Sequence, residues 1–99
     1  MANTFTVLFR GAASTDSTTL YTVPAGTTTL VTSIVAANST ASEATYNLSL
    51  GGTALATDVS VPANDSVVLE VKQVMNAGDV IQGAAGVGVN FHISGLEIA

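Results

Sequence analysis

Apolar and polar residues alternate along most of the chain with a period of two, and no segment shows the period of an amphipathic helix. The alternation predicts about eight short strands, over residues 4–9, 18–23, 28–37, 45–50, 53–61, 67–75, a segment around 80–81 and a last segment from 87 onward. We therefore predict an all-β chain that folds as an antiparallel two-sheet β-sandwich, jelly-roll-like or Ig-like.

Turn-forming residues separate the predicted strands. The motifs VPAG (residues 23–26) and VPAND (residues 61–65) align as a weak internal repeat, and each leads into an apolar strand. We interpret them as two equivalent corners of the two-sheet fold. Gly51-Gly52 predicts a two-residue hairpin, and NSTASE (residues 38–43) predicts a polar loop without an apolar anchor.

The predicted strand over residues 28–37 is apolar on both faces. Alternation places Leu30 and Ile34 on one side and Val31 and Val35 on the other. A strand with two apolar faces is central in its sheet, or its outer face is covered by another chain. These four residues are therefore our candidate assembly interface.

The alternation of apolar and polar residues changes phase once within the last predicted strand. Val87, Val89, Phe91 and Ile93 share one face, whereas Leu96 and Ile98 have the opposite parity. One extra residue restores the phase, so we predict a β-bulge around Ser94-Gly95; the alternative is a strand that ends at Ser94. At the other end of the chain, alternation puts Phe5, Val7 and Phe9 on one face.

Composition narrows the function classes. The 99 residues suit a single domain over 1–99, and a content of 47% hydrophobic and 9% charged residues favours assembly with other chains. Two basic residues against seven acidic ones give a net charge of -5, which argues against binding to nucleic acid or to anionic membranes. Cysteine is absent, which excludes disulfides, and the N-terminus does not predict a secretory signal.

Candidate catalytic residues are missing from the sequence. His92 is the single histidine, and by alternation it shares a face with Asn90 and Ser94, where we predict an ordinary exposed or interface side chain. The seven carboxylates are scattered without the spacing of a catalytic pair, and the glycine-rich residues 83–88 predict a flexible loop or tight turn. We predict no catalytic, cofactor-binding or metal-binding residue and no enzymatic activity. A calcium site on loop carboxylates and a sugar site on the threonine-rich faces remain alternatives.

Four motifs stand out along the chain: a VPAG corner into an apolar strand, a polar N-S-T loop, an AGDVI corner and a last strand ending in SG.E. They lie in LYTVPAGTTTLVTSIVAANSTASEATYNLSLGG, in VPANDSVVLEVKQVMNAGDVIQG and in VNFHISGLEIA. With these motifs, the chain from about residue 20 to residue 99 resembles the small β-sandwich virion proteins of tailed bacteriophages.

The resemblance implies a non-enzymatic virion structural protein. Our first expectation is a capsid decoration (cement) protein on the outer capsid surface, a homotrimer that binds the major capsid protein and stabilises the shell. The alternative is a tail or fibre accessory protein that contacts a host receptor or glycan. A cupin-like small-molecule or metal module is a third hypothesis, which the absence of a histidine cluster disfavours.

Overall fold

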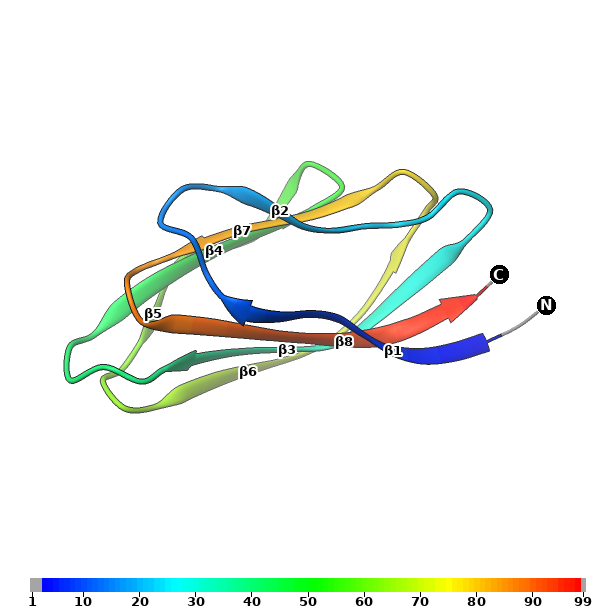
Figure 1. Ribbon diagram of the computed structural model, residues 1–99. Coiled ribbons are helices and arrows are strands. Elements are labelled where there is room, and N and C mark those ends of the chain that lie inside the picture. The colour runs from blue at the N-terminus through cyan, green and yellow to red at the C-terminus, as the bar shows by residue number, and fades with distance from the viewer. Residues whose placement is uncertain (1–2, 99) are drawn as a thin grey trace.

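The computed structural model describes residues 3–98, and it is built from strands alone (Figure 1). The strands are β1 (Asn3–Ala12), β2 (Thr18–Thr22), β3 (Thr28–Asn38), β4 (Ala44–Leu50), β5 (Thr53–Val61), β6 (Ser66–Met75), β7 (Val80–Ala85) and β8 (Val89–Ile98). This arrangement confirms the predicted all-β class and the predicted number of strands.

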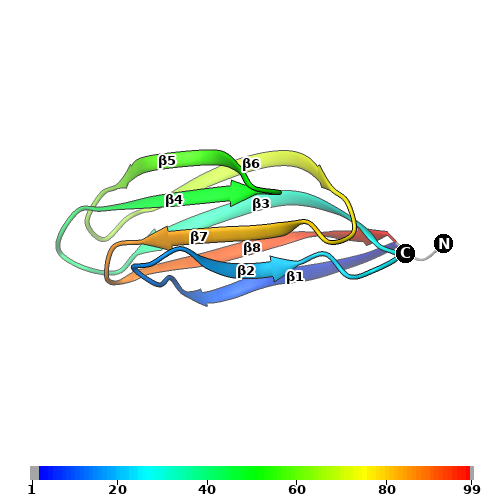
Figure 2. The same ribbon diagram turned by 90° about the horizontal axis from the view of Figure 1, so that it is seen from above.

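Two antiparallel sheets of four strands face each other. Sheet A has the order β1-β8-β3-β6 and sheet B the order β2-β7-β4-β5. Every connection crosses from one sheet to the other, except the β4–β5 hairpin, which stays in sheet B (Figures 1 and 2). This winding is that of a jelly roll, which decides between the two sandwich types that the sequence left open.

The predicted turns join the predicted strands. The VPAG corner leads from β2 into β3 and the VPAND corner leads from β5 into β6, so both carry the chain from sheet B to sheet A. They are equivalent corners, as the repeat indicated. Gly51 and Gly52 have φ angles of 60° and 82° and close the β4–β5 hairpin, because a two-residue turn of this type needs positive φ at both positions.

The core lies between the sheets. The ring of Tyr46 on β4 meets Phe91 on β8 edge-on, with centroids 5.9 Å apart and planes at 77°. The inward residues predicted on β4 and β6 confirm their assignment: Tyr46, Leu48 and Met75 are buried, and Leu50, Val67, Leu69 and Val71 pack against the buried cluster.

The predicted bulge lies on the neighbours of β8 rather than on β8 itself. β8 alternates without interruption, whereas β1 has one extra residue at Leu8 and β3 one extra residue at Thr32, both level with Ser94. A Cβ on Gly95 would meet the Leu30 carbonyl oxygen at 2.4 Å and Leu8 Cδ1 at 2.9 Å. Leu8 therefore fills the core beside this glycine, and β8 needs no bulge of its own.

Two predicted groupings, that of Leu96 and Ile98 with the core face of β8 and that of Phe5 and Val7 with Phe9, are wrong as a result. Leu96 and Ile98 lie on the outer face of sheet A, because β8 keeps its phase. Phe5 and Val7 also lie on the outer face, whereas Phe9, after the Leu8 bulge, packs against the core.

The glycine-rich segment at residues 83–88 is only partly a turn. Gly83 to Ala85 are the end of β7, and the turn itself comprises residues 86–88. A Cβ on Gly83 would lie 2.9 Å from the side chains of both Leu20 and Leu48, so glycine lets the core close here. Val87, predicted on a strand face, is 78% exposed in the turn.

The polar loop after β3 is held by a buried side chain. Asn38 is 3% exposed, and its amide nitrogen donates to the carbonyl oxygens of Ser42 at 2.8 Å and Val61 at 3.2 Å. Its side-chain oxygen accepts from the backbone N–H of Thr40 at 3.0 Å and from the Thr40 hydroxyl at 2.7 Å. The loop therefore has a polar anchor in place of the apolar one that the sequence lacks.

Candidate functional site

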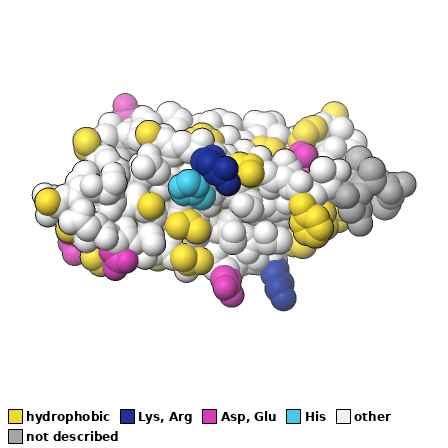
Figure 3. Space-filling view, turned by 60° about the horizontal axis from the view of Figure 1, so that its bottom comes forward, with side chains coloured by type: hydrophobic (Ala, Val, Ile, Leu, Met, Phe, Trp, Pro, Cys, Tyr) yellow, Lys and Arg dark blue, Asp and Glu magenta, His cyan; other side chains and the backbone are white. Residues whose placement is uncertain are grey.

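An apolar row crosses the outer face of sheet A. Phe5 lies opposite Leu96, Leu96 opposite Leu30, and Leu30 opposite Val74, so the row spans all four strands. Phe5 is 85% exposed and Val74 66% exposed, while Leu96 and Leu30 between them are half-buried. Val7, Val35 and Val68 extend the apolar surface along the same face, which Figure 3 shows from below the sandwich.

The sequence does not predict this row, because Phe5 on β1 and Leu96 on β8 are grouped with core residues by the predicted alternation. Alternation groups Phe5 with Phe9, and the predicted bulge returns Leu96 to the core face. The only sequence signals for the true arrangement are the phase break after Ile93 and the glycine at position 95 within a strand.

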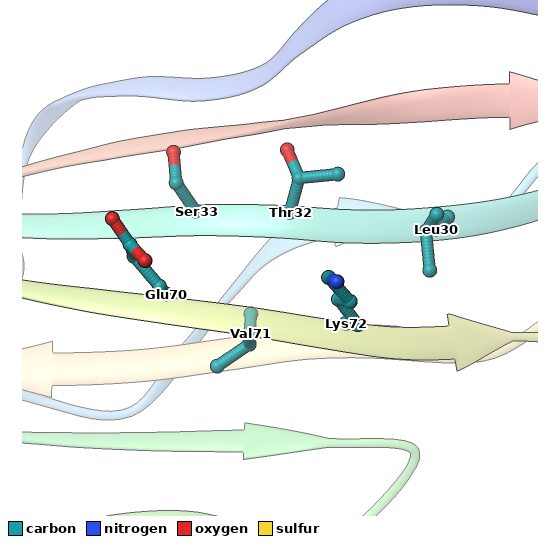
Figure 4. Close-up of a pocket in the computed structure, with 6 residues that line it drawn as sticks. All are labelled: Leu30, Thr32, Ser33, Glu70, Val71 and Lys72. Atoms are coloured by element: carbon teal, nitrogen blue, oxygen red, sulfur yellow. The ribbon is translucent and has the colours of Figure 1, made fainter.

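Two hollows lie on this face, beside the bulges at Leu8 and Thr32. One, of about 650 Å³, is lined by Leu30, Thr32, Ser33, Glu70, Val71 and Lys72, which come from β3 and β6 (Figure 4). The other, of about 320 Å³, is lined by Phe5, Thr6, Val7, Thr32, Ser94 and Gly95. Thr32 borders both, and its hydroxyl donates to the Ser94 carbonyl oxygen at 3.2 Å. Side chains of another surface could interlock with these hollows.

Both basic residues of the chain lie on the same face. Arg10 on β1 is opposite His92 on β8, and neither strand places a carboxylate on this side of the sheet. Lys72 and Glu70 lie on the same face of β6, the strand at the opposite edge of sheet A. Two cations and one carboxylate give the face a formal charge of +1, and the six other carboxylates give the rest of the chain -6.

The outer face of sheet B has the opposite character. Its strands pair Thr19 with Gln82, Gln82 with Ser49 and Thr45 with Ser60, so hydroxyl and amide groups dominate it. A small hollow of about 110 Å³ lies among these groups, between Asn47, Gln82 and Thr57. This face suits contact with water, whereas the outer face of sheet A exposes apolar surface that a covering partner would remove from water.

The candidate assembly residues fall on two different sides of β3. Because Thr32 is an extra residue, Val31 and Ile34 both point inward and are 0% exposed, whereas Leu30 and Val35 both point outward. The predicted pairing of Leu30 with Ile34 and of Val31 with Val35 is therefore wrong. Val31 and Ile34 belong to the core of the single chain, and only Leu30 and Val35 remain candidates for an interface.

His92 lies where the alternation placed it, on the outer face with Asn90 and Ser94. Its neighbours across the strands are Arg10 and Val35. Within residues 3–98 no three His, Cys, Asp or Glu residues gather in the way a metal ion requires. Among the same residues there is no helix that could span a membrane.

A polar cluster closes one end of the sandwich. The phenol of Tyr21 on β2 donates to the carboxylate of Glu97 on β8, and it lies 3.0 Å from the hydroxyl of buried Thr29 on β3. Burial raises the pKa of Tyr21, and the neighbouring Glu97 carboxylate raises it further. No sequence pattern predicts this cluster, because its members are far apart in the chain and meet only when the sheets pack.

Comparison of the chain with protein-family models, with curated proteins and with solved structures finds no match. The resemblance to phage virion proteins therefore stays a prediction, and the function has to be inferred from the surface of the jelly roll itself.

Proposed function

We propose that this protein is a non-enzymatic structural protein of a phage virion, a capsid decoration protein that binds the outer surface of the shell and stabilises it. The observation that carries the proposal is the contrast between the two outer faces of the sandwich. One face combines an apolar row with both cations, whereas the other carries neither basic residue and presents hydroxyl and amide groups along β2, β4 and β7. Such a domain is suited to sit with one face on protein and the other in water.

The jelly roll is compatible with this role but does not decide it. The fold occurs in viral capsid proteins, lectins and cupins, so function has to be argued from the surface. The candidate partners for the apolar face are a second copy of this chain and the major capsid protein. Nucleic acid and membrane are not among the proposed partners, because the chain carries a net charge of -5. The proposal assigns no catalytic residue, cofactor or metal.

The proposed mechanism is the burial of additional surface between shell subunits. A face of four strands, each about ten residues long, measures roughly 19 by 33 Å, or about 600 Å². Burial of apolar surface contributes about 25 cal/mol per Å², from which the costs of association are subtracted. Each bound copy would thus raise the free energy needed to separate the subunits that it bridges.

The test is the copy number of this chain in purified virions. Quantitative mass spectrometry against the major capsid protein is expected to give hundreds of copies, at a ratio near one to one. Absence of the chain from the particle would overturn the proposal.

A tail or fibre accessory protein that contacts a host glycan is the second candidate. The observation in its favour is the outer face of sheet B, where Asn47, Thr57 and Gln82 line a small hollow together with apolar residues such as Leu48 and Ala56. A few copies per particle, in multiples of three or six, together with binding on a glycan array, would favour this role over decoration.

A further inference from the structure

We propose that a second copy of this chain covers the outer face of sheet A, in a face-to-face dimer whose two-fold axis runs along the strands between the two sheets. The inference goes beyond the proposed function: of the two candidate partners for this face, it assigns the face to the second copy of this chain and not to the capsid protein. It also departs from the trimer expected from the sequence. A closed ring of three copies needs two different contact surfaces on each copy, whereas this is a single face.

The apolar row is complementary to itself under this rotation. An axis along the strands exchanges the two edges of the sheet but keeps each position at the same height. Phe5 on one edge then faces Val74 of the second copy, and Leu96 faces Leu30 of the second copy. The largest exposed side chain thus meets a smaller one, and sheets packed in this aligned way lie about 10 Å apart, close enough for side chains to interdigitate.

One pair of opposite charges, Arg10 and Glu70, fits the same arrangement. Arg10 on the β1 edge is level with Val68 on the β6 edge, since the register runs from Arg10 through His92 and Val35 to Val68. Rotation therefore places Arg10 over β6 of the second copy, two residues from its Glu70. Two strand residues span about 6.8 Å, a distance that an extended arginine side chain covers. The two-fold symmetry forms this ion pair twice. In the dimer Arg10 therefore has an acidic partner, which β1 and β8 do not supply on this face.

The area is sufficient for a specific complex. About 600 Å² per copy gives about 1,200 Å² in total, the lower bound for stable protein–protein interfaces. We therefore expect a dimer that dissociates on dilution.

Cross-linking between engineered cysteines tests the geometry, because the chain has no cysteine of its own. Phe5 and Val74 are three strand spacings apart in one chain, about 14 Å, which exceeds the reach of a short bis-maleimide. In the dimer each faces the other across the interface. The variant Phe5→Cys/Val74→Cys is expected to give covalent dimers. Neither single variant should do so, whereas an equal mixture of the two single variants should.

Charge reversal tests the ion pair. Arg10→Glu and Glu70→Arg should each weaken the dimer about tenfold or more by placing like charges together, and the double variant should restore most of the affinity. Sedimentation velocity at several protein concentrations supplies the measurement, and circular dichroism checks that each variant folds.

A matched pair of substitutions tests whether the dimer depends on this face or on exposed apolar residues anywhere on the surface. Val74→Glu should give folded monomers, whereas Val87→Glu, at a still more exposed valine in the β7–β8 turn, should leave the dimer intact. A wild-type chain that stays at 9.9 kDa at all concentrations, a trimer, or equal effects of the two substitutions would overturn the inference. A monomer with hundreds of copies on the virion would leave the proposed function standing and assign this face to the capsid protein.

Discussion

Tyr21 and Glu97 join the two sheets through one hydrogen bond, from the phenol on β2 to the carboxylate on β8, although 76 residues separate them in the chain. The Thr29 hydroxyl lies 3.0 Å from the same phenol oxygen. Burial is the main cause that raises the pKa of Tyr21, and the carboxylate adds to it, so the phenol stays protonated above the ordinary tyrosine range.

Replacing Tyr21 with phenylalanine is expected to reduce the loss of stability at alkaline pH. The folded chain holds the Tyr21 proton more tightly than the unfolded chain, because folding raises this pKa above 10.0. The Tyr21 contribution is complete below pH 10.0 and disappears as pH rises through the folded pKa. Urea unfolding at neutral and increasingly alkaline pH measures this. At neutral pH the variant should lose about 1.5–3 kcal/mol, the usual contribution of a hydrogen bond to a charged group. Identical pH profiles for the variant and the wild type would contradict the prediction.

Replacing Tyr46 with phenylalanine should leave stability unchanged or raise it by up to about 1 kcal/mol, because a buried hydroxyl without a partner costs free energy. Tyr46 is fully buried, and its hydroxyl forms no hydrogen bond within the described part of the chain. The edge-on contact with Phe91 survives the substitution. Thermal and urea unfolding supply the comparison, with Tyr21→Phe as the variant that should lose stability. A clear loss for Tyr46→Phe would reveal a partner for its hydroxyl, such as a buried water molecule.

Gly95→Ala is expected to destabilise the chain by about 1–3 kcal/mol, the usual cost of overpacking. The added methyl would lie 2.4 Å from the Leu30 backbone oxygen and 2.9 Å from Leu8 Cδ1, so sheet A must shift to admit it. Gly11→Ala is the control, because its methyl would lie 3.5 Å from the Phe9 ring, an ordinary contact. Urea midpoints that are equal for the two variants would argue against the close packing of β1, β3 and β8 at Gly95.

Asn38→Ala should cost about 1–3 kcal/mol, because it leaves the buried Val61 carbonyl oxygen and the Thr40 N–H without the Asn38 side chain. Hydrogen exchange should also speed up in the loop after β3. Asn76→Ala removes the same amide from an exposed turn and serves as the control. Equal exchange rates in the wild type and in Asn38→Ala would show that the loop does not depend on this anchor.

Leu30→Asp and Ile34→Asp should have opposite outcomes. Ile34 is fully buried, so an unpaired carboxylate there should prevent folding, whereas Leu30→Asp places the charge on the outer face of sheet A and should fold. Circular dichroism and thermal unfolding distinguish the two. Failure of both variants to fold would contradict the placement of Leu30 on the outer face.

Alternation predicted the strands better than it predicted which residues lie on the outer faces of the sheets. Alternation predicted the inward faces of β4 and β6, because the core residues of each strand keep the same parity along its whole length. On β3 the same rule failed after Thr32, since one extra residue reverses the parity of every residue beyond it. The candidate interface therefore lost Val31 and Ile34 to the core and kept Leu30 and Val35.

The sequence by itself determined the class of the fold, its turns and the sign of its charge, because these depend on local backbone preference and on composition. Only the tertiary structure decided which apolar residues stay outside. The bulges at Leu8 and Thr32 exist because neighbouring strands pack around Gly95, and packing between strands that are distant in the chain leaves no local pattern. The apolar row from Phe5 to Val74 and the Tyr21–Glu97 contact share that cause: each is made by strands that the chain brings together only when both sheets are complete.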